Sequence, residues 1–321
     1  ADIAKEELVE DVALVTGGAG FIGSHIVEEL SQRGAKVRVL DSLIKGRLSS
    51  IQPLIDEGRV EFLEGDIRSK DVVAKAMKGV DYVFHTAGVH ILRSVASPDE
   101  MIQANIQGSY NVFRAALDNG VRRVIFSSSS SIYGDPEKLP MSEDDPANPA
   151  EPYGASKWMS EQLLKHLSTE GLEYNSLRYF NVYGERQAAH AFYTTVISNF
   201  IKRILNGEPP IIDGEGTQSM DFTHVSDVVR ANMCAMECDT VNETFNVGTG
   251  ISTTIMGLAN ILKEALDADV EPICNGRPSI VTRRKADISK AKHLMGFKAQ
   301  VKVEDGLVQV AREIAAHPEL Y

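Results

Sequence analysis

The sequence predicts a doubly wound α/β fold, in which a parallel sheet carries helices on both faces, joined to a smaller C-terminal α/β domain. Three observations support this prediction. Strand-like apolar runs alternate with helical periodicity over the first 180 residues, the first of these runs ends in a glycine-rich turn, and the rhythm changes after Asn181. We expect residues 1–180 to form the first domain, with residues 221–250 contributing to it, and residues 181–321 to form the second.

The first domain begins with the continuous apolar run Val12–Val15, which is typical of a buried parallel strand. A helix over Gly20–Arg33 follows, because its apolar residues recur on one face. Further strands are predicted at Val37–Leu40, Val60–Leu63, Tyr82–His85, Val124–Ser127 and Ser176–Tyr179, and further helices at Val72–Met77, Met101–Leu117 and Lys157–Leu167. Alternation of this kind indicates βαβ units and a parallel sheet.

Beyond Asn181 the predicted elements follow no regular alternation. Helices are predicted at Thr194–Leu205, Asp227–Glu237, Thr254–Ala265, Ser289–Met295 and Val303–Ala316, extended segments at Pro209–Ile212, Asp221–Val225 and Thr244–Val247, and loops at 206–216 and 272–280. The mixture favours a small α/β domain over further βαβ units.

The overall composition of the chain excludes several kinds of partner. The 321-residue chain is 43% hydrophobic with a formal net charge of −12, and no basic run offsets this acidity, so we expect no nucleic-acid partner. No apolar stretch approaches the length that spans a bilayer, and residues 1–11 lack the apolar core of a signal peptide, so we expect no membrane partner. Three cysteines without metal-ligand spacing indicate a reducing, cytoplasmic setting and no metal site.

The turn Gly17-x-x-Gly20-x-x-Gly23 links the first predicted strand to the first helix. Its first glycine allows the tight turn, the second lets the backbone approach a pyrophosphate, and the third lets helix and strand pack closely. Free N–H groups and the helix dipole favour phosphates at this helix N-terminus. Asp41 ends the second strand, where a carboxylate binds ribose hydroxyls and repels a 2′-phosphate. These features predict a Rossmann domain that binds NAD rather than NADP.

Tyr153 and Lys157 stand four residues apart, and therefore on one face of a predicted helix. A tyrosine can act as acid and base on a substrate hydroxyl only if its pKa lies well below its usual value of about 10. The lysine charge, together with that of the oxidised nicotinamide, favours the phenolate. The serine run after the Val124–Phe126 strand, which includes Ser129 and Ser130, supplies candidate hydroxyl donors beside the substrate oxygen.

Together with further segments, these motifs give the chain a pattern that resembles an extended short-chain dehydrogenase/reductase, in the branch of nucleotide-sugar epimerases and dehydratases. The resemblance runs from about Val12 to Leu307. It rests on the segments TGGAGFIG (16–23), GDIR (65–68), HTAG (85–88), Asn105, 126–134, YGASK (153–157), RYFNVYG (178–184), DFTHVSD (221–227), FNVG (245–248) and ADISKA (286–291).

The resemblance implies a role for each matching residue. Ser129, Tyr153 and Lys157 would form the catalytic triad, and Asn181 would contact the substrate diphosphate. The implied cofactor contacts, besides the triad residues Tyr153 and Lys157, are Phe21, Ile22, Asp41, Asp66, Ile67, Ala87, His90, Asn105 and Phe180. The family often has lysine at the position of His90, so a merely structural histidine is the alternative there.

The triplet before Ile132 separates the branches of this family. Its dehydratases and decarboxylases carry carboxyl groups there, whereas this chain has Ser129, Ser130 and Ser131. Without an acid/base pair, elimination lacks its proton shuttle. The resemblance therefore implies a UDP-sugar 4-epimerase, in which tyrosine takes the 4-hydroxyl proton, C4 gives hydride to NAD, and hydride returns to the other face of a 4-keto sugar. The alternatives are a dehydratase, decarboxylase or 4-keto-sugar reductase of the same family, and a non-catalytic dinucleotide-binding protein.

The resemblance implies a UDP-hexose-type substrate without naming its sugar. Arg277 matches an arginine that binds the diphosphate, and Arg284 stands where residue size limits the C2 substituent. Arg284 would pair with a substrate carboxylate, as in UDP-glucuronic acid, or else be a solvated residue of a basic run. Met220 and Ile280 replace an arginine and an acid that usually hold the nucleotide.

A homodimer is implied by the same resemblance. In the family, the apolar faces of the helices that match Met101–Leu117 and Tyr153–Leu167 pair across a two-fold axis. Burial of those faces within one chain is the alternative.

Overall fold

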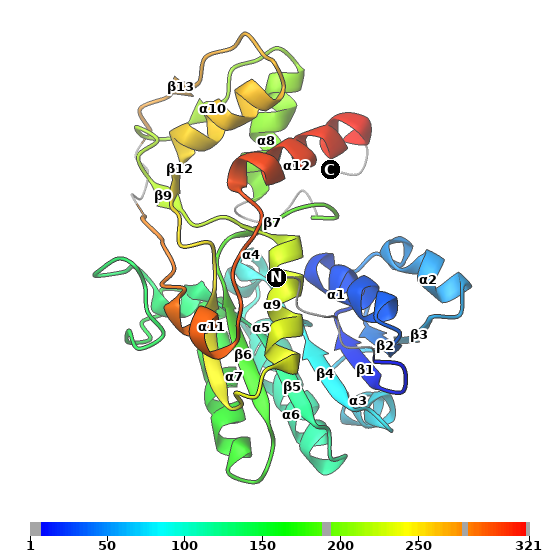
Figure 1. Cartoon of the computed structure of the whole chain (residues 1–321). Coiled ribbons are helices and arrows are strands. Elements are labelled where there is room, and N and C mark those ends of the chain that lie inside the picture. Colours follow the sequence, from blue (N-terminus) through cyan, green and yellow to red (C-terminus); the bar gives the residue numbers. More distant parts are fainter. Residues whose placement is uncertain (1–7, 188–193, 278–281, 319–321) are drawn as a thin grey trace.

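The structure, a computed structural model, describes residues 8–187, 194–277 and 282–318. Its centre is a seven-stranded sheet in the order β11-β6-β5-β4-β1-β2-β3, in which every neighbouring pair is parallel (Figure 1). The strands are β1 (Val12–Thr16), β2 (Lys36–Asp41), β3 (Val60–Glu64), β4 (Tyr82–His85), β5 (Arg123–Ser129), β6 (Tyr174–Tyr179) and β11 (Glu243–Val247). The predicted doubly wound parallel fold is confirmed.

Helices cover both faces of the sheet because its strands are apolar on both sides. Ala13 and Val15 of β1 join the core on one face, and Leu14 joins the core on the other. The first face is covered by α1 (Phe21–Gln32), α2 (Gln52–Asp56), α9 (Val225–Glu237) and α11 (Ser289–Leu294). The second face is covered by α3 (Lys70–Met77), α6 (Ser109–Asp118) and α7 (Pro152–Ser168).

The strand order reverses direction between β1 and β4. In doubly wound sheets a ligand binds at such a point, outside the carboxyl ends of the strands. The loops that follow β1 and β4 meet there, because Thr86 Oγ1 donates to the carbonyl of Thr16 at 2.6 Å. The fold therefore positions the glycine-rich turn at the expected ligand crevice.

A second cluster of helices lies beyond one end of the sheet (Figure 1). It packs α8 (Thr194–Leu205), α10 (Ile255–Ala265) and α12 (Val303–Ala316) around a separate apolar core. Three two-stranded pairs accompany it: β7 (Val182–Tyr183) with β10 (Thr223–His224), β8 (Ile211–Ile212) with β13 (Ile273–Cys274), and β9 (Ser219–Met220) with β12 (Thr253–Thr254). Among the helices of the described residues, none has the length and apolar composition that crossing a bilayer requires.

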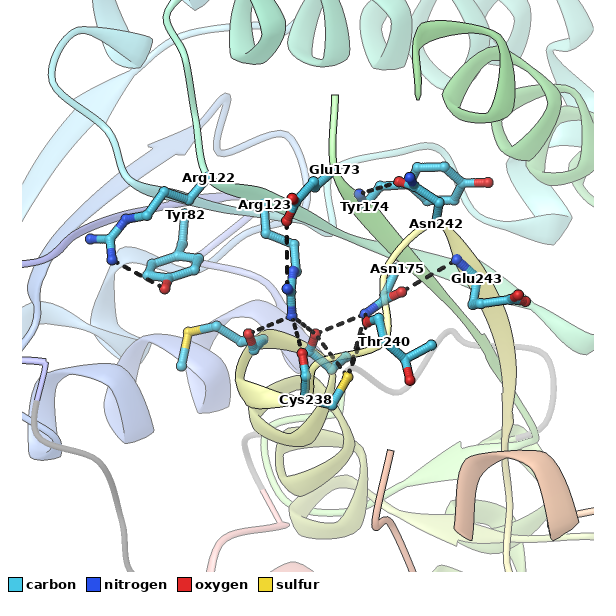
Figure 2. A network of polar contacts seen from close by, with 12 residues as sticks. Tyr82, Arg122, Arg123, Glu173, Tyr174, Asn175, Cys238, Thr240, Asn242 and Glu243 are labelled. Carbon is cyan, nitrogen blue, oxygen red and sulfur yellow. Dashed lines mark hydrogen bonds and ion pairs between the residues drawn. The ribbon is translucent and has the colours of Figure 1, made fainter. Parts of the chain in front are cut away.

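A polar network fastens the end of α9, and the segment that leads into β11, to strands β5 and β6 of the sheet (Figure 2). Arg123 Nη1 donates at 2.7–3.2 Å to three carbonyls at the end of α9, those of Ala235, Met236 and Cys238. Asn175 Nδ2 donates to the carbonyl of Thr240 at 2.8 Å, in the segment that leads into β11. A cation at a helix C-terminus satisfies carbonyls that lack helical partners and interacts favourably with the dipole. This network explains why a segment after residue 221 completes the sheet.

The single helix predicted over Met101–Leu117 is wrong in its middle part. The chain forms α5 (Pro98–Met101), a π-helix η2 (Ile102–Gly108) and then α6. The wider turn accommodates Asn105, whose side chain bonds Val89 and Ser156, and a Cβ at Gly108 would lie 2.7 Å from Ile67 Cγ1. Single π turns inside helices are frequent at functional sites.

The strand predicted over Asp221–Val225 is also largely wrong. Only Thr223–His224 is extended in β10, and α9 begins at Val225 because the His224 side chain accepts from the amide of Ser226. The Asp221 carboxylate is fully buried in a loop, where it accepts from the amides of Thr249 and Gly250, each at 2.9 Å. Tertiary hydrogen bonds, rather than strand pairing, order this segment.

Candidate active site

The glycine-rich turn lies between β1 and α1, and its close contacts explain the three predicted glycines. Gly17 has φ +69°, and a Cβ there would lie 2.8 Å from the amide nitrogen of Ala87. A Cβ on Gly23 would collide with the carbonyl of Gly17, so Gly23 sets the close packing of α1 against the turn. Gly20 is the N-cap of α1 and donates its amide to the Gly17 carbonyl at 3.0 Å.

The N-terminus of α1 fits a diphosphate. The N-cap residue Gly20 has no side chain that could cap the helix, and no acidic residue lies in the first turn of α1. Phe21 and Ile22, the first two residues of the helix, are half-buried. N–H groups at such a terminus lack helical partners and, with the helix dipole, attract an anion. The residues of this turn therefore fit the pyrophosphate of NAD.

Asp41 lies at the carboxyl end of β2, beside the same turn. Its buried carboxylate accepts from the amides of Ala19 at 3.0 Å and Leu43 at 2.8 Å, and a Cβ on Gly46 would lie 2.7 Å from it. Burial raises the pKa of Asp41, while the two amide hydrogen bonds lower it. A carboxylate in this place can bind the ribose of a nucleotide whose phosphates lie at α1.

The loop after β3 carries Asp66 and Ile67. The Arg68 guanidinium pairs with the Asp66 carboxylate, with Nη2 2.6 Å from Oδ2, and holds the pKa of that carboxyl below its usual value. Ile67 is buried, and its carbonyl accepts from Asn111 Nδ2 at 3.0 Å. Asp66 and Ile67, both predicted cofactor contacts, thus follow β3, the neighbour of the strand β2 that ends in Asp41.

The loop after β4 brings together Ala87, His90 and Asn105. The Ala87 amide donates to Thr16 Oγ1 at 3.3 Å, which ties this loop to the end of β1. The buried Asn105 side chain accepts from the Val89 amide at 2.6 Å and donates to its carbonyl at 2.9 Å. His90 is the N-cap of α4 (Ile91–Ala96) without a side-chain capping bond, and burial together with neighbouring cations lowers its pKa. His90 is therefore neutral at physiological pH.

Phe180 and Asn181 follow β6. Phe180 is fully buried, and its amide donates to the Val247 carbonyl of β11 at 3.0 Å. Asn181 has φ +35°, and its side-chain amide donates to the Asp221 carbonyl at 3.2 Å. These contacts join the end of the sheet to the C-terminal region.

Ser129, Tyr153 and Lys157 come together at the carboxyl end of β5. Tyr153 lies in the first turn of α7, and Lys157 Nζ lies 5.5 Å from the centre of its ring. Lys157 Nζ also donates to the carbonyl of Ser127 at 2.7 Å. Ser129, the last residue of β5, lies close enough to the Tyr153 phenol for its hydroxyl to lower the pKa of that phenol. The three residues that the resemblance proposes as a triad are thus neighbours in space.

Burial dominates the electrostatics of this cluster. Burial raises the pKa of Tyr153, the Glu151 charge raises it further, and the Ser129 hydroxyl lowers it. Burial lowers the pKa of Lys157 to about 8, whereas the Glu161 carboxylate raises it. Without a ligand the phenol therefore keeps its proton at neutral pH, and a positively charged ligand would favour the phenolate.

Two carboxylates beside this cluster were not predicted from the sequence. Glu161 accepts from Arg178 Nη2 at 2.7 Å and from Ser128 Oγ at 2.6 Å, and both members of the ion pair are buried. Glu151 is the N-cap of α7, two residues before Tyr153. The available signals were the spacing of Glu161 one turn after Lys157, and an acceptor side chain just before Pro152.

Arg284 reaches the serine run from the C-terminal region. Its Nη1 donates to the carbonyl of Ser130 at 3.1 Å and its Nη2 to that of Gly134 at 2.9 Å. Its Nε is buried and has no hydrogen-bond partner among the described residues. The structure thus places Arg284 against the serine run, with Ser130 itself buried.

The predicted diphosphate contact Arg277, and the two positions at which the chain departs from the family pattern, Met220 and Ile280, lie away from these contacts or outside the described residues. Arg277 is exposed, next to the undescribed residues 278–281, and its amide donates to Asn275 Oδ1 at 3.0 Å. Ile280 lies outside the described residues. Met220 is buried in the apolar core of the C-terminal helices.

Comparisons with known proteins identify a family for this chain. The NAD dependent epimerase/dehydratase family matches residues 13–248. A UDP-N-acetylglucosamine 4-epimerase from Methanobrevibacter ruminantium, solved with UDP-N-acetylmuramic acid, is 37% identical with a TM-score of 0.88, and the match covers 96% of this chain and 99% of that one. A UDP-glucose 4-epimerase from Thermotoga maritima, solved with UDP-glucose, is 36% identical with a TM-score of 0.88 and the same coverage.

A relative with a different reaction is similar over nearly the whole chain. The UDP-N-acetyl-alpha-D-glucosaminuronate decarboxylase of Bacillus cytotoxicus is 33% identical over 94% of this chain and 98% of its own length. Epimerases and a decarboxylase are thus similar to this chain over nearly its whole length. The chain belongs to the NAD dependent epimerase/dehydratase family, and NAD is its cofactor.

Proposed function

We propose that this protein is a UDP-sugar 4-epimerase that keeps its NAD bound. The observation that carries the proposal is the cluster of Ser129, Tyr153 and Lys157 at the ligand crevice, beside a serine run, Ser129–Ser131, that offers no carboxylate. Residues 1–180 with 221–250 would hold NAD, and residues 181–321 would hold the nucleotide sugar.

Each catalytic residue has one task in this proposal. Bound NAD would supply the acceptor, and then the donor, of the hydride at C4 of the sugar. Tyr153 takes the proton of the 4-hydroxyl and gives it back, and Ser129 donates a hydrogen bond to the same oxygen. Lys157, protonated below its pKa of about 8, stabilises the phenolate from one helical turn away.

The binding residues support a nucleotide diphosphate linked to a sugar. Asn181 and Arg277 would contact the diphosphate, and Ser130 and Arg284 would border the sugar. The unpartnered Nε of Arg284 favours an acidic substituent, as in a uronic acid, since a guanidinium binds a carboxylate strongly. The decarboxylase among the relatives makes the same acidic sugars the first alternative substrates to test.

The decisive experiment needs no added cofactor. Purified protein is denatured to measure released dinucleotide, and the native protein is assayed with UDP-glucose, UDP-N-acetylglucosamine and UDP-glucuronic acid, with products identified by NMR. Stoichiometric NAD and a C4 epimer from one of these sugars support the proposal. Released CO₂, turnover only with added dinucleotide, or no turnover would replace it by a decarboxylase, a reductase or a binding protein, respectively.

Asp41→Asn is expected to lower the affinity for NAD about tenfold or more, because hydrogen bonds to a charged carboxylate are each worth about 1.5–3 kcal/mol. Affinity for NADP should fall less, since repulsion of its 2′-phosphate is relieved at the same time. Calorimetric titration of both dinucleotides into cofactor-free protein measures the two constants. Glu64→Gln, an exposed carboxylate at the end of neighbouring β3, is the matched control and should change neither. Equal losses for NAD and NADP would contradict the ribose contact.

We also propose a homodimer formed through α4, η2 and α7. The inner faces of α6 and α7 pack on the sheet within one chain. On the outside, α4, η2 and α7 leave five large apolar side chains exposed: Leu92, Val95, Ile102, Trp158 and Met159. Such a set of exposed apolar side chains on adjoining helices is typical of an interface between copies.

Trp158→Glu is expected to convert the dimer into a monomer, because a buried unpaired charge at an interface costs several kcal/mol. Light scattering coupled to gel filtration at micromolar concentration measures the mass. Leu205→Glu, which introduces the same charge at an exposed position on α8, serves as the control. A wild-type monomer, or a Trp158→Glu dimer, would contradict the assignment.

A further inference from the structure

The N-cap of the catalytic helix is a glutamate. Ser, Thr, Asp and Asn are the residues preferred at this position. Both oxygens of Glu151 are engaged: Oε2 accepts from the amide of Tyr153 at 2.7 Å, and Oε1 from that of Gly154 at 3.0 Å. A carboxylate therefore binds the backbone of the residue whose phenol is the proposed base.

The first turn of α7 is also packed tightly against the serine run. A Cβ on Gly154 would lie 2.6 Å from the carbonyl of Ser131 and 3.0 Å from Glu151 Oε1. Arg284 donates to the carbonyls of Ser130 and Gly134, which flank Ser131 in the chain. Burial raises the pKa of Glu151, and the charge of Arg284 lowers it. A small displacement of the Glu151 carboxylate would therefore move Tyr153 relative to Ser129.

We propose that Glu151 is a positioning residue for Tyr153: its carboxylate fixes the first turn of α7 against the serine run and places a negative charge beside the phenol. This inference rests on the proposed function, in which Tyr153 is the base. It assigns a role to a residue that does not touch the substrate.

The sign of the effect follows from the charges that face the phenol. The groups that act on it are Glu151, Tyr179 and Ser129, and Lys157 Nζ lies 5.5 Å from the centre of its ring. Tyr133 and Arg178 lie on elements packed against α7, and Arg284 binds the serine run. The Glu161 charge is paired with Arg178. Glu151 therefore supplies the negative charge that raises the pKa of Tyr153. Its neutralisation must lower that pKa and extend base catalysis to lower pH.

Two neutral variants test this in the NAD-loaded protein. Glu151→Gln removes the charge with little change of shape, and Glu151→Ser keeps a preferred N-cap if glutamine folds poorly. The Tyr153 phenol is titrated directly by NMR of protein labelled at tyrosine Cζ, with its signal identified by its loss in Tyr153→Phe. We expect its midpoint, and the acidic limb of kcat/KM against pH, to move about one pH unit lower in both variants.

Two further variants calibrate the shift. Glu151→Asp keeps the charge and should leave the midpoint in place. Glu143→Gln neutralises another half-buried carboxylate, one that accepts the Asn246 amide at 2.7 Å, and should also leave it in place. Unchanged midpoints in Glu151→Gln and Glu151→Ser, with only a lower Tm, would reduce Glu151 to a helix cap and overturn the inference. If the wild type epimerises no UDP-sugar, the proposed function fails, while the NMR midpoints still decide the effect of Glu151.

Discussion

Tyr153→Phe is expected to lower kcat by about 10³-fold, because a positioned acid/base contributes about 10²–10⁴-fold to a proton transfer. The phenyl ring remains, so the packing of α7 against β5 is kept and NAD should stay bound. The epimerisation assay with the best UDP-sugar measures the loss, and dinucleotide released on denaturation confirms that the site is still loaded. A variant that keeps more than a tenth of wild-type turnover would exclude Tyr153 as the base.

A second buried tyrosine provides the matched control for this experiment. The Tyr179 hydroxyl lies 2.9 Å from Ser127 Oγ and accepts from Asn232 Nδ2 at 2.8 Å, and burial raises the pKa of Tyr179 to about 12. Tyr179→Phe also deletes one hydroxyl on an adjoining element, and we expect it to cost about 1–3 kcal/mol of stability because Asn232 loses a partner. Its kcat should stay within a few-fold of wild type. The pair of variants separates loss of a hydroxyl from loss of the catalytic hydroxyl.

The sequence predicted the elements whose formation depends on local pattern. The run Val12–Val15 is apolar on both sides because both faces of β1 are covered, and the three glycines of the following turn mark the places where backbone and helix approach closely. The helix around Tyr153 and Lys157 was equally predictable, since its i, i+4 spacing is local.

The errors fell where distant groups decide the local conformation. Nothing in the sequence around Asn105 shows that its side chain will bond Val89 and Ser156 and occupy a π-helical turn. Asp221 reads as part of a strand until the amides of Thr249 and Gly250 are brought to its carboxylate. The short pair β8–β13 joins segments about sixty residues apart along the chain, so no local pattern predicts it.

The same distinction applies to the site. The proximity of Ser129, Tyr153 and Lys157 could be predicted because each of them belongs to a short motif, whereas their electrostatic surroundings could not. Arg284 binds the carbonyl of Ser130 across 154 residues of sequence, and Glu161 meets Arg178 only because α7 packs on β6. These contacts set the charges beside Tyr153 and Lys157, so the chemistry of the site depends on tertiary structure that its motifs do not contain.

Glu161→Gln is expected to lower the free energy of unfolding by about 3–5 kcal/mol, because it leaves the buried Arg178 charge without its partner. The substitution also replaces the charged acceptor of Ser128 Oγ by a neutral amide, since that hydroxyl donates to Glu161 at 2.6 Å. Urea denaturation at fixed NAD concentration measures the change. Glu170→Gln removes a carboxylate from an exposed pair with Arg114, and it should cost less than about 1 kcal/mol.

The same substitution should alter catalysis, because the Glu161 charge raises the pKa of Lys157. Without it, the pKa of Lys157 falls further below its present value of about 8, and the alkaline limb of kcat against pH moves to lower pH. The double variant Glu161→Leu, Arg178→Met removes both charges and should recover stability, since apolar replacements of a buried pair are often neutral or stabilising. It should not restore the alkaline limb. A double variant that regains both stability and the wild-type limb would mean that Glu161 acts on catalysis only by holding the fold.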